Sequence, residues 1–201
     1  MAWAPDYATP TELGAYRRIG DGKDDVELAL AVSSASRAID EATGRQFGHT
    51  DTTEARTYDA GWSDRLGLYV VEIDDVHTVT GLVVTVNGAA VTAGNYRLLP
   101  RDADKRGRPW ERLALRTVTP DPLRGCGLGE VSVTATFGWS AVPATIHNAC
   151  LLQASRFFAD RNMPHGIAGS PDLGNELRLL AKVHPDVEVM LMPYQRDGGD
   201  Q

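Results

Sequence analysis

The residues best able to do chemistry in this chain are its five histidines and two cysteines. None of the histidines occurs in an H-E-x-x-H pattern or beside a pair of cysteines, the close spacing that zinc sites use. The sequence therefore predicts no metal site. The histidines are His49, His77, His147, His165 and His184.

Taken one by one, these residues favour structural roles. Cys150 lies inside a predicted helix and is expected to be a small buried hydrophobe. A reducing compartment fits both cysteines, and a disulfide with Cys126 stays open but is unsupported. His147 flanks an apolar stripe on the same helix, which indicates a packed or rim histidine. His165 stands in a Gly/Pro loop, where a loop role or a subunit contact is expected.

Two further patterns imitate binding sites. Residues 125–129 read Gly-Cys-Gly-Leu-Gly, but they lead into a predicted strand, whereas phosphate loops present backbone N–H groups at the start of a helix. Asp21, Asp24 and Asp25 lack the spacing of an EF-hand loop, so helix capping explains them better. Because there is also no G-x-S-x-G nucleophile pattern, we expect neither catalysis nor a cofactor.

One segment departs from the charge of the rest of the chain. Residues 101–116 carry six basic and three acidic side chains, a local charge of +3 in a chain whose net charge is −7. This segment is interpreted either as a solvated hairpin loop or as a contact with a polyanion or an acidic partner. Its basic side chains are Arg101, Lys105, Arg106, Arg108, Arg112 and Arg116.

Length and composition set wide limits. With 201 residues, of which 42% are hydrophobic and 23% charged, the chain can form one domain with a sizeable core, or a domain plus a lobe. The acidic net charge argues against a general nucleic-acid binder. No apolar run approaches the roughly 18 residues of a membrane span, and the first residues lack a signal-peptide pattern. We therefore expect a cytoplasmic location where the protein is made, with no membrane contact.

The elements that would position these residues begin and end with helices. Helices are predicted at about residues 10–18, 24–43, 143–160 and 172–182. Thr9 and Glu12 form a capping box at the first of them. In the second, apolar residues recur at helical spacing and a glycine follows the last turn. That stripe consists of Leu28, Val32, Ala35, Ile39 and Ala42.

Between the second and third helices the period changes to two, which is typical of strands. Asn87-Gly88 follows a β-branched run and favours a tight hairpin, because both turn positions need positive φ. An antiparallel β-lobe is therefore expected over about residues 52–138, inserted into a helical bundle. The predicted class is α+β, as a single domain over residues 1–195 with a disordered tail over 196–201.

The helix predicted over residues 143–160 has a broad apolar surface. One stripe follows helical spacing, and Leu151, Ala154 and Phe158 form a second stripe that overlaps it. Because one partner covers only part of a helix circumference, this helix is expected to pack on two sides. Leu151, Phe157 and Phe158 are the candidates for bundle or inter-subunit packing.

Between two prolines, residues 186–193 place valine or leucine at every second position. Val187, Val189 and Leu191 fall on one side of this alternation, so a strand is predicted here. The open interpretations are a strand that joins a partner's sheet, a strand docked on the protein's own sheet, and a helix turn at the end of the domain.

In their order along the chain, these elements resemble the head–tail connector (adaptor, or head-completion) proteins of tailed bacteriophages, those of siphophages in particular. The resemblance covers about residues 9–195, and the β-lobe is larger than in the most compact members. It rests on Thr9-Pro10-Thr11-Glu12-Leu13, the helix over 24–43 closing on Gly44-Arg45-Gln46-Phe47, Val86-Asn87-Gly88, Asn95-Tyr96-Arg97-Leu98-Leu99-Pro100, Gly138-Trp139-Ser140-Ala141-Val142-Pro143 and Phe157-Phe158-Ala159-Asp160-Arg161.

The resemblance implies a structural virion protein without enzymatic activity. Family members form a ring, commonly of twelve subunits, beneath the portal at the neck between head and tail. The ring extends the DNA channel and receives the next tail-side component. The implied partners are the portal ring, a stopper or tail-completion protein, further copies of the chain, and DNA that passes without sequence-specific binding. The implied location is the virion neck, and the host cytoplasm during assembly.

Candidate contacts follow from the resemblance. The candidates for a subunit contact or for lining the channel are Arg101, Lys105, Arg106 and Arg108. In relatives the C-terminal segment can dock on the portal, which makes the portal-binding candidates Val187, Val189, Leu191, Tyr194 and Arg196. The alternatives are another neck or tail-joining protein such as a stopper or tail terminator, a DNA-binding module, and a non-viral α+β domain with an unrecognised site.

Overall fold

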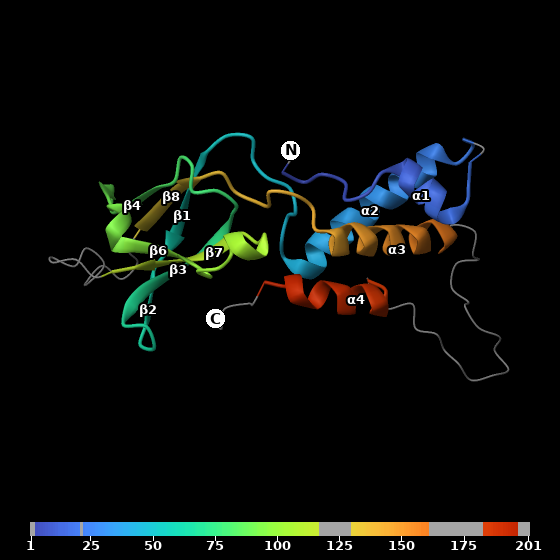
Figure 1. Ribbon diagram of the computed structural model, residues 1–201. Helices are drawn as coiled ribbons and strands as arrows, with labels where there is room; N and C mark the ends of the chain where they lie inside the picture. The colour runs from blue at the N-terminus through green and yellow to red at the C-terminus, as the bar shows by residue number, and fades with distance from the viewer. Residues whose placement is uncertain (1–2, 21, 117–129, 161–182, 197–201) are drawn as a thin grey trace. The chain divides into compact units, whose positions relative to one another are not determined.

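The chain divides into two compact units (Figure 1). The computed structural model describes residues 3–20, 22–116, 130–160 and 183–196. The β unit comprises Met1–Ala4 and Gln46–Ala141, and the helical unit comprises Pro5–Arg45 and Val142–Gln201. The predicted α+β class, with an antiparallel β-lobe inserted between helices, is confirmed. The single domain expected over residues 1–195 stays a prediction.

The first helices of the helical unit begin and end where local signals place them. α1 (Pro10–Arg17) starts after Thr9, whose hydroxyl accepts the Glu12 backbone N–H while the Glu12 carboxylate accepts that of Thr9. The predicted capping box is therefore present. α2 (Asp25–Thr43) ends at Gly44, which has a φ of 64°. Asp24 stands at the N-cap of α2, but its side chain makes no capping hydrogen bond, because its backbone is not in the extended region that such a cap uses.

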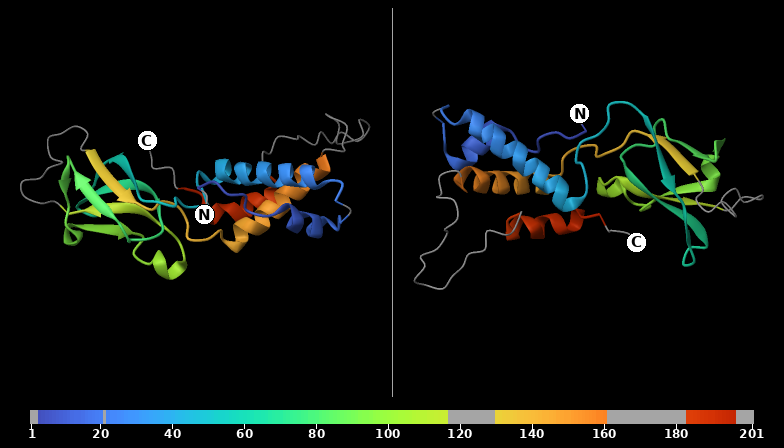
Figure 2. Two further views of the ribbon diagram at one scale, coloured as in Figure 1. Left: turned by 90° about the horizontal axis from the view of Figure 1, so that it is seen from above. Right: turned by 180° about the vertical axis from the view of Figure 1, so that it is seen from behind.

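α3 (Ala144–Asp160) is the helix with the broad apolar surface. It packs against α1, α2 and α4 (Figure 2). The expected packing on more than one side is therefore seen within this unit, and the helix's main apolar stripe is covered by neighbouring helices. Its buried side chains are Ile146, Ala149, Cys150, Gln153, Ala154 and Phe158.

The strand predicted over residues 186–193 is wrong. The chain forms a helix there, α4 (Pro185–Leu191), continued by a short 3-10 turn, η4 (Met192–Tyr194). Helix-start chemistry overrides the alternation, because proline suits the first helical position and His184 Nδ1 accepts the Asp186 N–H at 3.2 Å. The helix predicted over 172–182 lies outside the described residues.

Burial along α4 follows the helical period. Val187 and Leu191, four residues apart, are both fully buried, whereas Val189 is 63% exposed. Residues four apart share one face of a helix, while residues two apart do not. The apparent alternation therefore came from two buried positions and one surface position.

The β unit contains two antiparallel sheets of four strands each, in the orders β1-β8-β4-β5 and β2-β3-β7-β6 (Figure 1). Both sheets contribute side chains to one apolar core, with Val71 and Ile73 from one sheet and Val131 and Val133 from the other. The strands are β1 (Glu54–Asp59), β2 (Gly61–Ser63), β3 (Leu68–Val76), β4 (Val83–Val86), β5 (Ala89–Ala90), β6 (Tyr96–Leu99), β7 (Trp110–Leu115) and β8 (Glu130–Ala135), with 3-10 turns η1 (Ala93–Asn95) and η2 (Asp104–Arg106).

The hairpin signal is confirmed in the β4–β5 turn. Asn87 and Gly88 have φ values of 48° and 79°. They join strands in which Val86 pairs with Ala89. Both turn residues thus occupy the left-handed region that this type of tight hairpin requires.

The β unit closes at a corner where only glycine fits. Gly138 has a φ of 110°, and a Cβ on it would lie 2.0 Å from the carbonyl oxygen of Gly48. The Trp139 N–H donates to that same oxygen at 2.8 Å, and its indole N–H donates to Asp75 Oδ2 at 2.8 Å. The indole also packs on Phe47, with ring centroids 5.1 Å apart.

Candidate interaction surfaces

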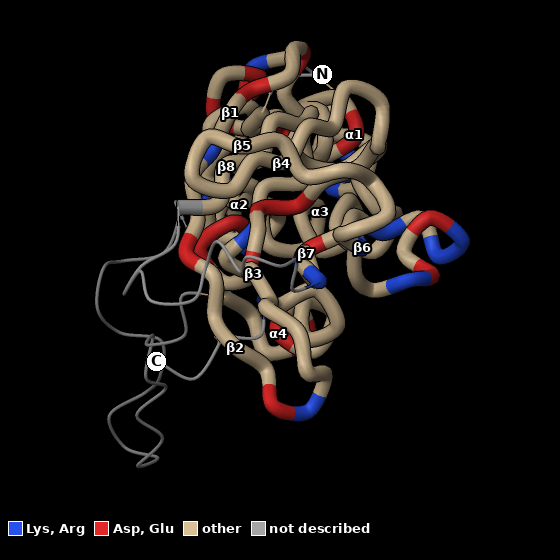
Figure 3. Tube along the Cα trace, turned by 90° about the vertical axis from the view of Figure 1, so that its left-hand side faces the viewer, with Lys and Arg blue, Asp and Glu red and all other residues tan. Residues whose placement is uncertain are grey.

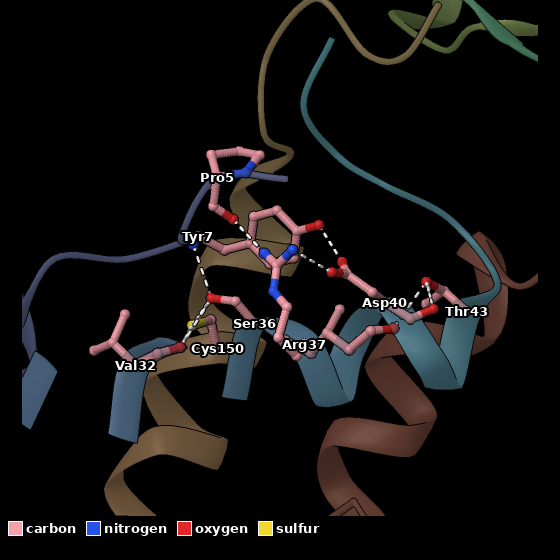
Figure 4. Close-up of polar contacts among 9 residues, drawn as sticks. Pro5, Tyr7, Val32, Ser36, Arg37, Asp40, Thr43 and Cys150 are labelled. Carbon is pink, nitrogen blue, oxygen red and sulfur yellow. Dashed lines mark hydrogen bonds and ion pairs between the residues drawn. The ribbon is translucent and has the colours of Figure 1, made fainter. Parts of the chain in front are cut away.

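Buried polar groups in the helical unit hold the segment before α1 onto α2 (Figure 4). The Tyr7 hydroxyl donates to the Asp40 carboxylate, which also pairs with Arg37 at 2.9 Å. Arg37 donates to the Pro5 carbonyl oxygen at 2.6 Å, and the Tyr7 N–H donates to Ser36 Oγ at 3.0 Å. Because the Asp40 side chain is only 8% exposed, these partners offset the cost of burying its charge. The cluster therefore has a structural role.

Cys150 is the buried small hydrophobe that the sequence predicts. Its side chain is fully buried in α3, with Sγ 3.5 Å from Ser36 Oγ (Figure 4). Burial raises the pKa of the Cys150 thiol, which disfavours the reactive thiolate. Cys126 lies outside the described residues.

A second polar cluster stabilises the edge of the β unit. The Arg56 guanidinium on β1 lies between two aromatic rings, 4.8 Å from the Trp3 centroid and 4.2 Å from that of Phe137. Arg56 and the Tyr58 hydroxyl both donate to Asp74 Oδ2 at 2.9 Å, which links β1 to β3. Burial, helped by the Asp74 charge, raises the pKa of Tyr58 well above its ordinary value, so the phenol stays protonated.

The described histidines make separate local contacts. His147 lies at the rim of α3, with Nε2 3.3 Å from Glu12 Oε1, as the rim interpretation expects. Hydrogen bonds from Thr9, and then from His147, lower the pKa of Glu12. His49 and His77 pack against each other in the β unit, with ring centroids 5.0 Å apart and the rings tilted by 40°. Among the described residues, no three His, Cys, Asp or Glu side chains gather into a metal site. His165 lies outside them.

The C-terminal segment is tied to the helical unit at both ends. At its start, the His184 N–H donates to Gln153 Oε1 on α3 at 2.9 Å, and the Gln153 side chain is fully buried. At its end, the Arg196 N–H donates to the Thr43 carbonyl oxygen at 3.0 Å. Arg196, the first residue of the expected tail, is thus held in place, and residues 197–201 lie outside the described residues.

The portal-binding candidates therefore differ in their surroundings. Val187 and Leu191 face the interior of the helical unit, and Val189 faces solvent. Tyr194 and Arg196 are partly exposed. The backbone of Tyr194 is also engaged, because Arg45 Nε donates to its carbonyl oxygen at 2.8 Å.

The candidates on α3 also separate. Phe158 is 6% exposed, and the Arg17 guanidinium of α1 lies 5.7 Å from its ring centroid. Phe158 therefore packs within the bundle. Leu151 and Phe157 are partly exposed.

The candidate basic residues lie in the loop between β6 and β7. Arg101, Lys105, Arg106 and Arg108 are all exposed, and the loop carries charges of both signs (Figure 3). Ala103, which is fully buried, anchors it. The Ala103 carbonyl oxygen accepts the N–H groups of Arg106 and Arg108 at 3.1 and 2.9 Å. Arg106 also pairs with Asp102 at 2.6 Å.

Two exposed aliphatic pairs lie on the helical unit, and of their four members only Val189 was a candidate from the sequence. On α2, Val26 and Leu30 are 79% and 67% exposed, and on α4 and η4, Val189 and Met192 are 63% and 58% exposed. The available signal was their position off the buried stripe of an amphipathic helix. Val26 and Leu30, four apart, flank Leu28, which packs inward.

Comparison with known proteins gives likeness in fold alone. No protein-family model matches the chain, and neither does any curated protein. The chain is similar to one in the neck of an empty GTA particle computed with C6 symmetry, with 20% identity and a TM-score of 0.50. It is also similar to one in the virion of a native gene transfer agent (GTA) particle, with 23% identity and a TM-score of 0.50. Each match covers 100% of this chain and 96% of the other. Among the described helices, none is long and apolar enough to cross a bilayer.

Proposed function

We propose that the protein is a structural component of the neck of a tailed, phage-like particle, without enzymatic activity. In this proposal it forms a ring beneath the portal, joins the DNA-filled head to the tail and extends the DNA channel. The observation that carries the proposal is a likeness in fold to a chain of a GTA neck, which covers the whole of this chain and so includes both units.

The ring is proposed to contain twelve copies. The neck to which the chain is similar was computed with sixfold symmetry, with which a ring of twelve is compatible. Neighbours in such a ring meet through two different patches, which must complement each other. The exposed aliphatic pair on α2, Val26 and Leu30, is a candidate for one of these patches, because large apolar side chains on a surface mark contact sites when they gather.

The portal contact is proposed to use the outward face of α4 and η4. Since Val187 and Leu191 pack inward, the side chains that can reach a partner are those of Val189 and Met192, together with the partly exposed Tyr194 and Arg196. This replaces addition of a strand to a partner's sheet, which an α-helix cannot supply. The tail-side partner is proposed to be a stopper or tail-completion protein.

The test is co-sedimentation of the purified protein with the portal ring of its own particle, followed by imaging of the complex. We expect a stoichiometric added ring. Absence of binding to an intact portal would remove the proposal. Val189→Asp with Met192→Asp should abolish the contact, because each places a charge on the α4 face. Val79→Asp with Val83→Asp, at valines of the β unit that are 57% and 49% exposed, is the matched control and should bind as the wild type does.

A further inference from the structure

Charge is distributed unevenly between the region of the β6–β7 loop and the rest of the chain. Residues 97–112 carry six basic and three acidic side chains, hence +3, which leaves −10 elsewhere because the net charge is −7. All six cations are exposed. They are the four loop cations Arg101, Lys105, Arg106 and Arg108, with Arg97 on β6 and Arg112 on β7.

The two strand arginines extend the cationic region from the loop onto the sheet. The register pairs Arg97 with Ala114 and Leu99 with Arg112. Directly paired residues share a face, and so do residues two apart on one strand, so Arg97 and Arg112 lie on the same face. As diagonal neighbours they are about 7 Å apart.

This region lacks the apolar centre of a protein–protein contact. Such contacts have a fully buried apolar core surrounded by a polar rim. The exposed large hydrophobic side chains of the described residues all lie outside residues 97–112. The small apolar Ala103 points inward and is fully buried. Exposed cations without exposed apolar anchors are typical of contacts with nucleic-acid phosphates.

The backbone of the loop is ordered by its own hydrogen bonds. The hydrogen bonds to the Ala103 carbonyl oxygen fix the backbone around Arg106 and Arg108, and Gly107 between them has a φ of 63°. A backbone that is already ordered loses little entropy on binding. The Asp102–Arg106 pair and the neighbouring Asp104 reduce the positive charge, so each loop would bind phosphates weakly and reversibly.

We propose that the β6–β7 loop, with Arg97 and Arg112, contacts the backbone phosphates of duplex DNA. This inference rests on the proposed function, which places DNA inside a ring of these chains. A weak contact repeated around a ring keeps the duplex centred and lets it pass, because no single subunit grips it. The contact reads no sequence, because phosphates carry none.

The test compares two variants of the full chain that lose the same charge. Arg101→Gln, Lys105→Gln and Arg108→Gln together neutralise the loop and leave the Asp102–Arg106 pair intact. Arg18→Gln, Lys23→Gln and Arg65→Gln remove the same charge from other exposed positions. The affinity for a short duplex DNA is measured by fluorescence anisotropy at several salt concentrations.

We expect the loop variant to bind DNA at least about ten-fold more weakly at low salt, and the slope of log K against log salt to fall by about 3. The control variant should stay within about two-fold of the wild type, because phosphate contacts act locally. Equal losses in both variants, or no DNA binding by the wild type at low salt, would overturn the inference.

Co-sedimentation with the portal ring separates this inference from the proposed function. If the loop variant binds DNA normally but fails to join a portal that the wild type joins, the loop contacts a protein. The DNA inference then fails while the proposed function stands. If the wild type does not join the portal, the proposed function fails, and the DNA titration still decides what the loop binds.

Discussion

Different kinds of contact complete the packing of the two units. The β unit closes where backbone meets backbone, since the Gly138 corner leaves no room for a Cβ beside the Gly48 carbonyl oxygen. The helical unit is completed by its C-terminal segment, in which α4 buries Val187 and Leu191, and His184 before it and Arg196 after it each donate a backbone hydrogen bond to the rest of the unit. A contact between two backbone segments leaves no room for a side chain. A packed helix is destabilised by substitutions on its buried face only. The stability of the β unit should therefore be sensitive to substitution at single positions such as Gly138. In α4, the effect of a substitution should follow the helical period.

The unfolding of the two units can be measured separately. All four tryptophans, at positions 3, 62, 110 and 139, belong to the β unit. Tryptophan fluorescence therefore reports unfolding of the β unit. Far-ultraviolet circular dichroism is dominated by helices, and the described α-helices belong to the helical unit.

The largest effect is expected for Gly138→Ala. The new Cβ would overlap the Gly48 carbonyl oxygen and force alanine to a φ of 110°, so the corner must open. We expect the free energy of unfolding of the β unit to fall by about 4 kcal/mol or more, measured by denaturation followed through tryptophan fluorescence.

Gly94→Ala is the matched control for that change. Gly94 lies in the same unit, and a Cβ on it would meet nothing within 4 Å. Its effect should stay within about 0.5 kcal/mol. Similar losses for the two variants would show that the corner is not the closure of the unit.

The next largest effect is expected for Leu191→Ala in α4. Removing this fully buried side chain leaves a cavity, and the free energy of unfolding of the helical unit should fall by about 3 kcal/mol. Val189→Ala, two residues away at a position that is 63% exposed, should change it by less than about 0.5 kcal/mol. Circular dichroism during denaturation measures both. Equal losses at the two positions would indicate an alternating strand instead of a helix.

Much of the fold could be predicted because its signals are local. The Thr9–Glu12 capping box, the Gly44 stop and the Asn87-Gly88 hairpin each depend on a few neighbouring residues, and all are present. The stripe on α2 also follows its predicted period. Local chemistry and packing agree at these places, which is what allows a short segment to be interpreted alone.

The errors came where two periods were both possible. Over residues 186–193 the valines and leucine fit an alternation as well as a helical face, and the deciding features were the His184 cap and Pro185. Short apolar runs do not separate helix from strand by periodicity. The docking of that helix through Gln153 could not be predicted, because the hydrogen bond joins residues 31 positions apart in sequence.

Of the candidate surfaces, the sequence indicated the basic loop but not the apolar pair on α2. The basic loop could be found because charge clusters in the sequence remain clusters on an exposed loop. Val26 and Leu30 were missed because the sequence does not show which face of a helix is packed against other elements. Only the packing of α2 shows that Leu28 is buried while its neighbours are exposed.

The smallest effect is expected with pH, and it concerns the same corner of the β unit. His49 forms a β-bridge with Gly138 and packs on His77, whose Nδ1 is buried and has no hydrogen-bond partner among the described residues. Burial, and then the His49 charge, lower the pKa of His77 from its ordinary value of 6.5. Unfolded chains therefore bind a proton at this position at higher pH than folded ones do. As pH falls through the ordinary value, the β unit loses stability until the lowered pKa is passed.

His77→Gln removes this proton and should flatten the pH dependence. Between about pH 7.5 and pH 5.5, the denaturation midpoint of the wild type, followed by tryptophan fluorescence, should fall more than that of the variant. Other groups titrate in this range, so the difference between the two proteins carries the inference. His147→Gln, in the helical unit, should leave the fluorescence midpoint parallel to the wild type. His49→Gln should give an intermediate slope, because it removes the second cause of the shift and leaves the burial of His77. If the denaturation midpoints of the wild type and His77→Gln change equally with pH, the histidine pair does not make the stability of the β unit depend on pH.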